Sequence, residues 1–140
     1  MEGELERLFE KFSLDPYCRL LGIRLVELKR GYSRVTLRVS EEMLNFHGVA
    51  HGGLILSLAD AAFAAASNSH NQVAVALNIN INYRRPVRAG EELTAEAFEE
   101  NLGKTTALYR MVVKNSAGQL VALCQGLVYR REEPVLKGNR

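Results

Sequence analysis

The chain has 140 residues, a net charge of +2 and 47% apolar residues, which suits one domain, residues 1–140, around one hydrophobic core. The 18 Lys and Arg residues are dispersed among 16 Asp and Glu residues, so we expect no nucleic-acid partner. The longest apolar run, residues 54–66, is too short to span a membrane, and the start lacks a signal segment, so we expect a cytoplasmic protein without membrane contact. Cys18 and Cys124 form no CxxC pair and are expected to be core residues.

The first predicted element is a short amphipathic helix over residues 3–13, in an N-terminal helical region at 1–16. It is indicated by apolar residues at the spacing of one helical face, namely Leu5, Leu8, Phe9 and Phe12. The helix should end before Asp15, because the following Pro16 disfavours helix there. Two antiparallel strands are predicted next, at 23–28 and 32–39.

A longer helix is predicted over residues 54–67, which are apolar nearly all round and must therefore be buried on most sides. Period-two alternation then predicts a strand at 73–83, with these residues on one face: Val73, Val75, Leu77, Ile79 and Ile81. Glycine-containing turns separate three more predicted strands, at 92–99, 104–114 and 120–130. The tail, 131–140, is expected to fray. This order predicts an α+β fold in which an antiparallel sheet, ending in a four-strand meander, is wrapped around one central helix.

Asp60 is the only Asp, Glu, Lys or Arg between Met43 and Tyr83. A buried carboxylate without a partner is costly. Asp60 therefore lies on an exposed stripe, bonds to Ser57 or a backbone group, or occupies a protected pocket as a general base or nucleophile. The lack of any other charge on this helix weakens the exposed alternative.

The residues before the helix provide the second half of a candidate site. Gly52 and Gly53 let the backbone approach a ligand closely and leave N–H groups free at the positive end of the helix. A carbonyl oxygen held there would be polarised, as acyl transfer requires. Asn45 and His51 are placed to orient a ligand or a water. A plain glycine turn is the alternative, but Asp60, eight residues after Gly52, favours a site.

Other chemistries are disfavoured by the motifs. His47 and His51 have i, i+4 spacing, but Gly48 stands where a zinc protease has Glu, so we predict no metal site. Ser57 is not in a GxSxG elbow, and the glycines form neither a GxGxxG motif nor a phosphate loop. His70 is expected to be a solvated loop residue.

The segment NFHGVAHGGLILSLADAAFAAASNS, residues 45–69, closely resembles the motif of the hotdog-fold acyl-CoA thioesterases, in their phenylacetate-degradation, PaaI-like branch. The likeness runs from about Tyr17 to Arg130 and includes LGIRL, NINYRRP, RAGEELTAEA and GKTTALYRM. It implies the hotdog fold, an antiparallel sheet around one long helix. It also implies a homodimer with a continuous sheet and sites between subunits, assembled into a homotetramer as a dimer of dimers.

The resemblance implies a function, hydrolysis of an acyl-CoA thioester such as phenylacetyl- or hydroxyphenylacetyl-CoA. Coenzyme A then enters as part of the substrate, and no cofactor is expected. Asp60 corresponds to the family's catalytic acid, which attacks the thioester carbonyl or activates water. Gly52 corresponds to the glycine whose N–H polarises the thioester oxygen, and Asn45 and His51 to residues that position the thioester or the water. The carboxylate and the glycine amide usually come from different subunits.

Further positions correspond to substrate and CoA contacts, namely Gly53, Asn68, Tyr83, Arg84, Arg85, Gly103, Lys104 and Thr105. For the basic residues among them a solvated edge is the alternative. Some relatives carry a Ser or Thr that assists the water where this chain has Ala74, so Asn68 or its loop is expected to take over that function.

Two alternatives keep the fold but change the function. A non-catalytic acyl-CoA-binding or sensor module is the first, and the joint presence of the four matched catalytic residues favours the enzyme instead. Hydratase or dehydratase chemistry on acyl thioesters is the second. It is disfavoured because Met43 stands where a D-x-N-x-x-H stretch would place Asp.

Overall fold

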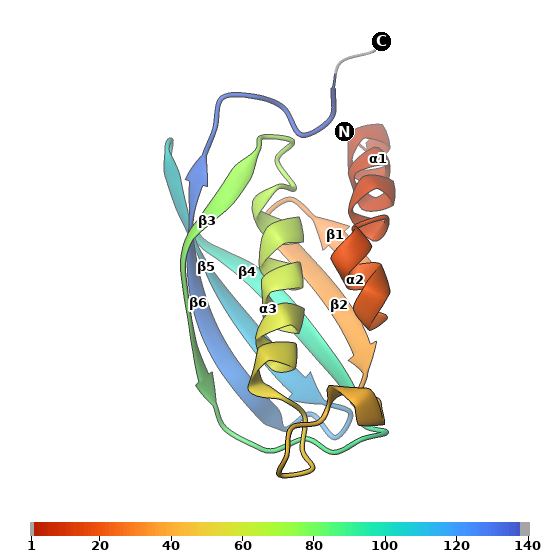
Figure 1. Ribbon diagram of the computed structural model, residues 1–140. Coiled ribbons are helices and arrows are strands. Elements are labelled where there is room, and N and C mark those ends of the chain that lie inside the picture. The colour runs from red at the N-terminus through yellow and green to blue at the C-terminus, as the bar shows by residue number, and fades with distance from the viewer. Residues whose placement is uncertain (1, 138–140) are drawn as a thin grey trace.

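The computed structural model describes residues 2–137, and Figure 1 shows one long helix held in the concave face of a curved sheet. Within these residues the helices are α1 (Glu2–Ser13), α2 (Pro16–Leu21) and α3 (Gly52–Ser67). The strands are β1 (Arg24–Lys29), β2 (Tyr32–Arg38), β3 (Ala74–Tyr83), β4 (Glu92–Leu102), β5 (Thr106–Asn115) and β6 (Leu120–Arg130). The predicted antiparallel sheet around a central helix, the hotdog arrangement, is therefore confirmed. None of the helices in this range is long and apolar enough to cross a membrane.

The N-terminal region contains a second helix that was not predicted. The first helix ends at Ser13, as expected, but Pro16 then begins α2 instead of only ending α1. Proline is favoured in the first turn of a helix, where its missing N–H costs nothing. The Asp15 carboxylate caps this turn by accepting the Cys18 N–H at 3.0 Å, and Gly22, with φ 81°, ends the helix.

The central helix α3 is buried on most of its surface, as its apolar composition predicted. Phe63 packs directly over Gly126 of β6, where an added Cβ would lie 2.5 Å from the Phe63 ring. Phe63 also meets the ring of Tyr109 edge to face, with centroids 5.9 Å apart. A glycine is thus required in the middle of β6 so that the helix can approach the sheet this closely.

The order of the strands differs from the predicted meander. The sheet runs β1-β2-β4-β5-β6-β3, so β3 pairs with β6 at an edge and β4 lies between β2 and β5. The connection at 84–91 crosses the end of the sheet. It is anchored there because Val87 is buried, its carbonyl accepts the Ala50 N–H at 2.7 Å, and Gly90 and Glu91 bond to Val39. These long-range contacts are not visible in local periodicity.

The predicted face of β3 is also corrected. The pairing of β3 with β6 shifts register between Ala76 and Asn78. Even-numbered residues before this bulge and odd-numbered residues after it therefore lie on the same face of the strand. Ile79 and Ile81 pack against the core, whereas Val75 and Leu77 are 44% and 57% exposed. An edge strand with exposed apolar residues is a surface on which another chain can pair.

Two expectations about loops and tail are corrected as well. The imidazole of His70 is half-buried and its Nε2 lies 2.7 Å from Glu99 Oε1, which also accepts the hydroxyl of the buried Tyr109. His70 is therefore a structural partner and not a solvated residue. The tail does not fray at 131–136, because its backbone bonds to the loop at 71–73. Residues 138–140 of the predicted frayed tail lie outside the described range.

Candidate active site

The start of α3 presents a free backbone donor. His51 is the N-cap, and its Nδ1 accepts the Gly53 N–H at 2.9 Å, while its carbonyl accepts the N–H groups of Leu54 and Ile55. The amide of Gly52 has no acceptor anywhere in residues 2–137. Because Nδ1 accepts a hydrogen bond, the ring proton of neutral His51 is on Nε2. The donor predicted from the glycine pattern is therefore Gly52 and not Gly53, whose N–H is used by the cap.

The end of β3 is fixed to this helix start. The Tyr83 hydroxyl donates to the Gly52 carbonyl at 2.7 Å, and a Cβ added to Gly52 would lie 3.1 Å from the Tyr83 oxygen. Gly52, Tyr83, Arg84 and Arg85 line one open recess of about 410 Å³. The structure thus brings the expected oxyanion donor together with three of the expected CoA contacts. The arginines add positive charge at the same end of the sheet.

Asn45 organises the loop that precedes the helix. Its side-chain oxygen accepts the His47 N–H at 2.9 Å and the Val49 N–H at 3.4 Å, and its own N–H donates to the Val49 carbonyl at 2.8 Å. The NH₂ group of Asn45 makes no hydrogen bond within the described part of the chain. This arrangement leaves two donors next to the helix start, as a role in orienting a ligand or water requires.

Asp60 lies midway along α3 and opens into a cavity of about 390 Å³ between this helix and the α1–α2 segment. Its carboxylate makes no hydrogen bond or ion pair with residues 2–137. Ser57, the partner considered from the sequence, is bonded instead to the Tyr17 hydroxyl at 2.9 Å. Asp60 therefore faces the cavity without a partner, and in the single chain the residue is exposed to solvent, as one of the alternatives from the sequence expected.

Burial among the cavity walls raises the pKa of Asp60, and the nearby negative charge of Asp15 raises this pKa further. The other titratable groups that line the cavity are Tyr17 and Cys18. Burial and the contact with Asp15 raise the pKa of the Cys18 thiol to about 12, so it stays protonated and is not a nucleophile. A carboxylate whose pKa is raised in a cavity is suited to act as a base or nucleophile near neutral pH.

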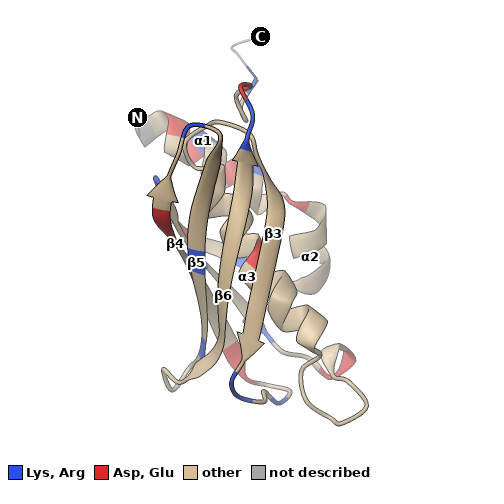
Figure 2. Cartoon of the chain, turned by 90° about the vertical axis from the view of Figure 1, so that its left-hand side faces the viewer, with Lys and Arg blue, Asp and Glu red and all other residues tan. Residues whose placement is uncertain are grey.

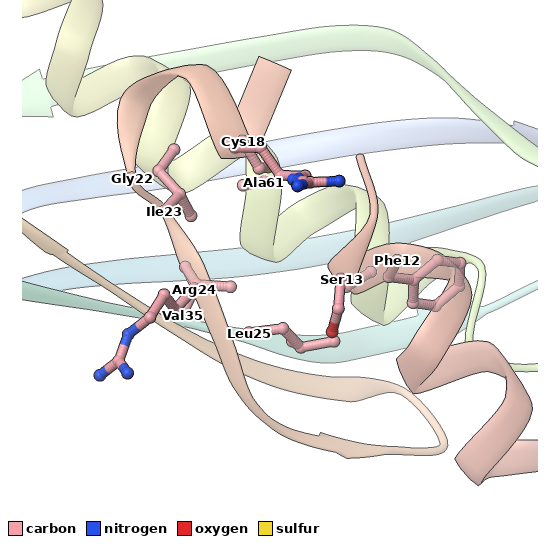
Figure 3. Close-up of a pocket in the computed structure, with 11 residues that line it drawn as sticks. Phe12, Ser13, Cys18, Gly22, Ile23, Arg24, Leu25, Val35 and Ala61 are labelled. Atoms are coloured by element: carbon pink, nitrogen blue, oxygen red, sulfur yellow. The ribbon is translucent and has the colours of Figure 1, made fainter. Parts of the chain in front are cut away.

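A second cavity, of about 400 Å³, is shown in Figure 3 and shares wall residues with the first. Phe12, Cys18 and Ala61 line both cavities, so these side chains stand between them. The second cavity continues to the apolar side chains of Ile23 and Leu25. The α1–α2 segment therefore forms a wall of mixed polarity opposite α3, a wall that the sequence pattern did not assign to the site.

Asn68 lines the Asp60 cavity, but its amide is already in use. Its Nδ2 donates to the carbonyls of Ala64 and Ala74 at 2.9 and 3.1 Å, and its Oδ1 accepts the Ala74 N–H at 2.9 Å. These bonds fasten the end of α3 to the start of β3. The geometry does not leave an N–H of Asn68 for the water-assisting function expected from the sequence.

The hairpin at 103–105 lies at the other end of the sheet from Gly52 (Figure 1). The Gly103 carbonyl accepts Arg130 Nη1 at 2.8 Å, and the Thr105 carbonyl accepts the Arg130 N–H at 2.7 Å. Lys104, Arg130 and Arg131 line a recess of about 540 Å³ together with Glu132 and Glu133, and Arg131 pairs with Glu133 at 3.2 Å. Sequence reasoning missed the two arginines, which lie at the end of a strand and carry no motif. Within one chain the expected CoA residues therefore form two separate groups.

Asp60 and the Gly52 amide are also separated. Asp60 follows Gly52 by eight residues of α-helix, which rise about 12 Å. To act on one thioester, the carboxylate and the oxyanion donor must both come within about 3 Å of the reacting carbonyl group or of the attacking water. A single chain therefore holds the two halves of the predicted site apart. Among residues 2–137, no three metal-ligating side chains gather in one place.

The chain is similar in sequence to known proteins. The family described as the thioesterase superfamily matches residues 47–122. A curated relative from Archaeoglobus fulgidus is 51% identical over 85% of this chain and 77% of its own length. Acyl-coenzyme A thioesterase PaaI of Escherichia coli is 40% identical over 83% of each chain.

Two solved structures are similar as well. The structure of the E. coli PaaI protein, from the phenylacetic acid degradation operon, covers 94% of this chain and 96% of its own, with a TM-score of 0.90 and 35% identity. A Streptococcus mutans protein solved with bound acetyl CoA covers 80% of this chain and 90% of its own, with a TM-score of 0.77 and 29% identity.

Proposed function

The chain belongs to the thioesterase superfamily, and from this premise we propose that it hydrolyses an aryl-acetyl-CoA thioester, such as phenylacetyl- or hydroxyphenylacetyl-CoA, to the free acid and CoA. Acyl-CoA thioesterase activity is shared with its relatives. The aryl-acetyl group is supported by the similarity to a protein of the phenylacetic acid degradation operon. It is supported also by the cavity beside Asp60, whose walls include Phe12, Cys18 and several alanines.

The observation that carries the mechanism is the separation of the free Gly52 amide from the unpartnered Asp60 carboxylate along one helix. Both groups suit thioester hydrolysis, yet about 12 Å of helix lies between them. We infer that each active site combines Asp60 of one chain with Gly52 of a second copy. A monomer would then have both halves and no complete site.

Edge strand β3 is the surface we propose for the contact between the two copies. It carries no charged residue and exposes Val75 and Leu77, and Figure 2 shows β3 and β6 as a charge-poor stretch of the sheet. Within residues 2–137 the free edge of β3 has no partner strand. A two-fold axis would pair β3 antiparallel with its own copy and make one continuous sheet.

This pairing would also reunite the separated groups of residues. In each chain α3 runs opposite to β3, because Gly52 contacts Tyr83 and Asn68 contacts Ala74. Antiparallel pairing of β3 would therefore carry the partner's Gly52 away from this chain's Gly52 and toward the half of α3 that contains Asp60 and Asn68. It likewise brings the partner's Arg84 and Arg85 toward the end of the sheet that carries Lys104 and Thr105. Phosphates of CoA would then meet basic residues from both chains.

In the proposed reaction the Gly52 N–H donates to the thioester oxygen and stabilises the negative charge that develops there. The Asp60 carboxylate takes a proton from water as that water attacks the carbonyl carbon, or it attacks the carbon itself and water then cleaves the anhydride. The C–S bond breaks, and the CoA thiolate leaves and is protonated. Incorporation of ¹⁸O into Asp60 during a single turnover in labelled water would indicate the anhydride route.

The proposed chemistry uses only protein groups, with coenzyme A entering as part of the substrate. We propose further that two dimers form a tetramer and that the enzyme acts in the cytoplasm. Two free cysteines suit a reducing compartment. The charge-poor outer face of β3 and β6 offers a surface for the second contact between dimers.

Substrate choice is tested by a thiol-release assay with benzoyl-, phenylacetyl-, short-chain and long-chain CoA esters. We expect the highest kcat/KM for the phenylacetyl ester, because the cavity of about 390 Å³, walled in part by Phe12 and alanines, suits an aryl group on a short linker. A straight-chain ester as the best substrate would contradict the aryl-acetyl assignment. Binding of every ester without release of thiol would instead identify a sensor module.

A further inference from the structure

The cavity beside Asp60 contains a pair of hydroxyl groups that the reaction does not use. Tyr17 Oη and Ser57 Oγ lie 2.9 Å apart and join α2 to α3. Ser57 precedes Asp60 by three residues, so both side chains lie on neighbouring positions of the same helical face. Tyr17, Ser57 and Asp60 all line the one cavity of about 390 Å³. The pair thus lies about one helical turn from the Asp60 carboxylate, within the cavity proposed for the acyl group.

The amide donors of Asn68 in this cavity are already engaged. Both N–H groups of Asn68 are donated to backbone carbonyls. One carboxylate oxygen of Asp15 caps α2, and Asp60 is assigned to the chemistry. The remaining walls are apolar or carry the protonated Cys18 thiol. Ionised Asp15 and Asp60 can only accept hydrogen bonds, so among the groups that line the cavity the Tyr17–Ser57 pair is left to offer an O–H to a polar feature of the substrate.

The pair has one O–H donor to spare. Two hydroxyl groups have two O–H donors, and the bond between them uses only one. Neither hydroxyl bonds to any other group within residues 2–137, so the second O–H has no protein acceptor. Because Tyr17 is 55% exposed, water can occupy that position while the cavity is empty. An apolar acyl group would displace this water and leave the donor unpaired, which is costly.

We propose that Tyr17 and Ser57 form a specificity-determining pair that binds a hydroxyl group on the acyl part of the substrate. The substrate hydroxyl oxygen accepts a hydrogen bond from whichever O–H of the pair is not used between Tyr17 and Ser57. The substrate O–H in turn donates to an oxygen of the pair, so every O–H of the three groups has an acceptor. The inference rests on the proposed function, since it takes this cavity as the acyl pocket. It assigns a preference for ring-hydroxylated aryl-acetyl esters to two residues of this chain.

The test compares kcat/KM for 4-hydroxyphenylacetyl-CoA and phenylacetyl-CoA in the wild-type protein, Tyr17→Phe, Ser57→Ala and the double variant. We expect the wild type to favour the hydroxylated ester and each single variant to lower this ratio by about tenfold, the usual effect of one lost hydrogen bond. The double variant should lose little more than either single one, because the pair acts as a unit. Ser116→Ala, in the exposed turn between β5 and β6, is the matched control and should keep the ratio.

Equal losses on both esters would overturn the inference, and so would a wild type without preference for the hydroxylated one. Thermal unfolding of each variant separates a specificity effect from loss of fold. The same variants are assayed with hexanoyl-CoA and 6-hydroxyhexanoyl-CoA. If the wild type hydrolyses neither aryl ester, the proposed function fails. The ratio of kcat/KM for 6-hydroxyhexanoyl-CoA to that for hexanoyl-CoA then tests the role of Tyr17 and Ser57: a lower ratio in the variants supports this role, and an unchanged ratio overturns it.

Discussion

Replacement of Asp60 by Asn will lower the kcat of thioester hydrolysis by at least about a hundredfold while leaving the fold intact. Asn has nearly the same shape as Asp but can neither take a proton from water nor form an anhydride. The side chain makes no hydrogen bond or ion pair within the described residues, so no structural contact is lost. Thiol release measures the rate, and circular dichroism and thermal unfolding report on the fold.

The pH dependence has a definite sign. Because the cavity and Asp15 raise the pKa of Asp60, the wild-type rate should fall as the pH decreases through a value above the usual carboxyl pKa of about 4. The folded protein then binds this proton more tightly than the unfolded chain, so ionised Asp60 opposes folding at neutral pH. We therefore expect Asp60→Asn to raise the Tm at neutral pH and to lose this advantage as the pH falls.

The matched control is Asp15→Asn, which removes the same charge from the same cavity. Asn caps helices about as well as Asp, so α2 should keep its start. We expect this variant to retain activity within about tenfold, because Asp15 does not react with the substrate. Wild-type activity in Asp60→Asn, or equal losses in both variants, would remove Asp60 from the mechanism.

Replacement of Gly52 by Pro will lower kcat by about a hundredfold to a thousandfold, because it deletes the one N–H that is free at the start of α3. Gly52 is the first helical residue, where proline is favoured, and His51 already has the extended backbone, φ −62° and ψ 139°, that precedes proline. The variant therefore removes a donor with little damage to the helix. Single-turnover kinetics on the best ester of the panel measure the chemical step.

Gly52→Ala separates the lost N–H from the added carbon. Both variants place a Cβ about 3.1 Å from the Tyr83 oxygen, but alanine keeps the amide proton. Tyr83 is exposed and can move slightly, so we expect Gly52→Ala to lose far less activity than Gly52→Pro. Equal losses in the two variants would mean that crowding against Tyr83, and not the amide, explains the effect.

The strands, the buried helix and the main site residues could be predicted from the sequence, because each is indicated by a local pattern of residues. Alternation with period two marked the strands, and the apolar composition of residues 54–67 marked a buried helix. Asp60 stood out as a lone charge, and the glycines before the helix indicated a free donor, which the structure assigns to Gly52. Each of these features depends on residues within a few turns of one another.

The remaining features depend on contacts between distant segments. The place of β3 at the edge and its bulge near Leu77 arise from pairing with β6, about fifty residues later. The role of His70 depends on Glu99, and the bond of Tyr17 to Ser57 joins residues forty positions apart. The wall that α1 and α2 build opposite Asp60 is likewise a tertiary feature. Local periodicity in the sequence does not indicate which distant residues come into contact.

Two chains build each active site in the proposed enzyme, and mixed dimers of Asp60→Asn and Gly52→Pro provide the decisive test. In a mixed dimer one site would combine the intact Asp60 of one chain with the intact Gly52 of the other. Co-production of the two inactive variants in equal amounts should therefore restore about one quarter of wild-type activity per chain, since about half of the dimers are mixed and each has one good site. Activity no higher than the sum of the two variants alone would contradict the account.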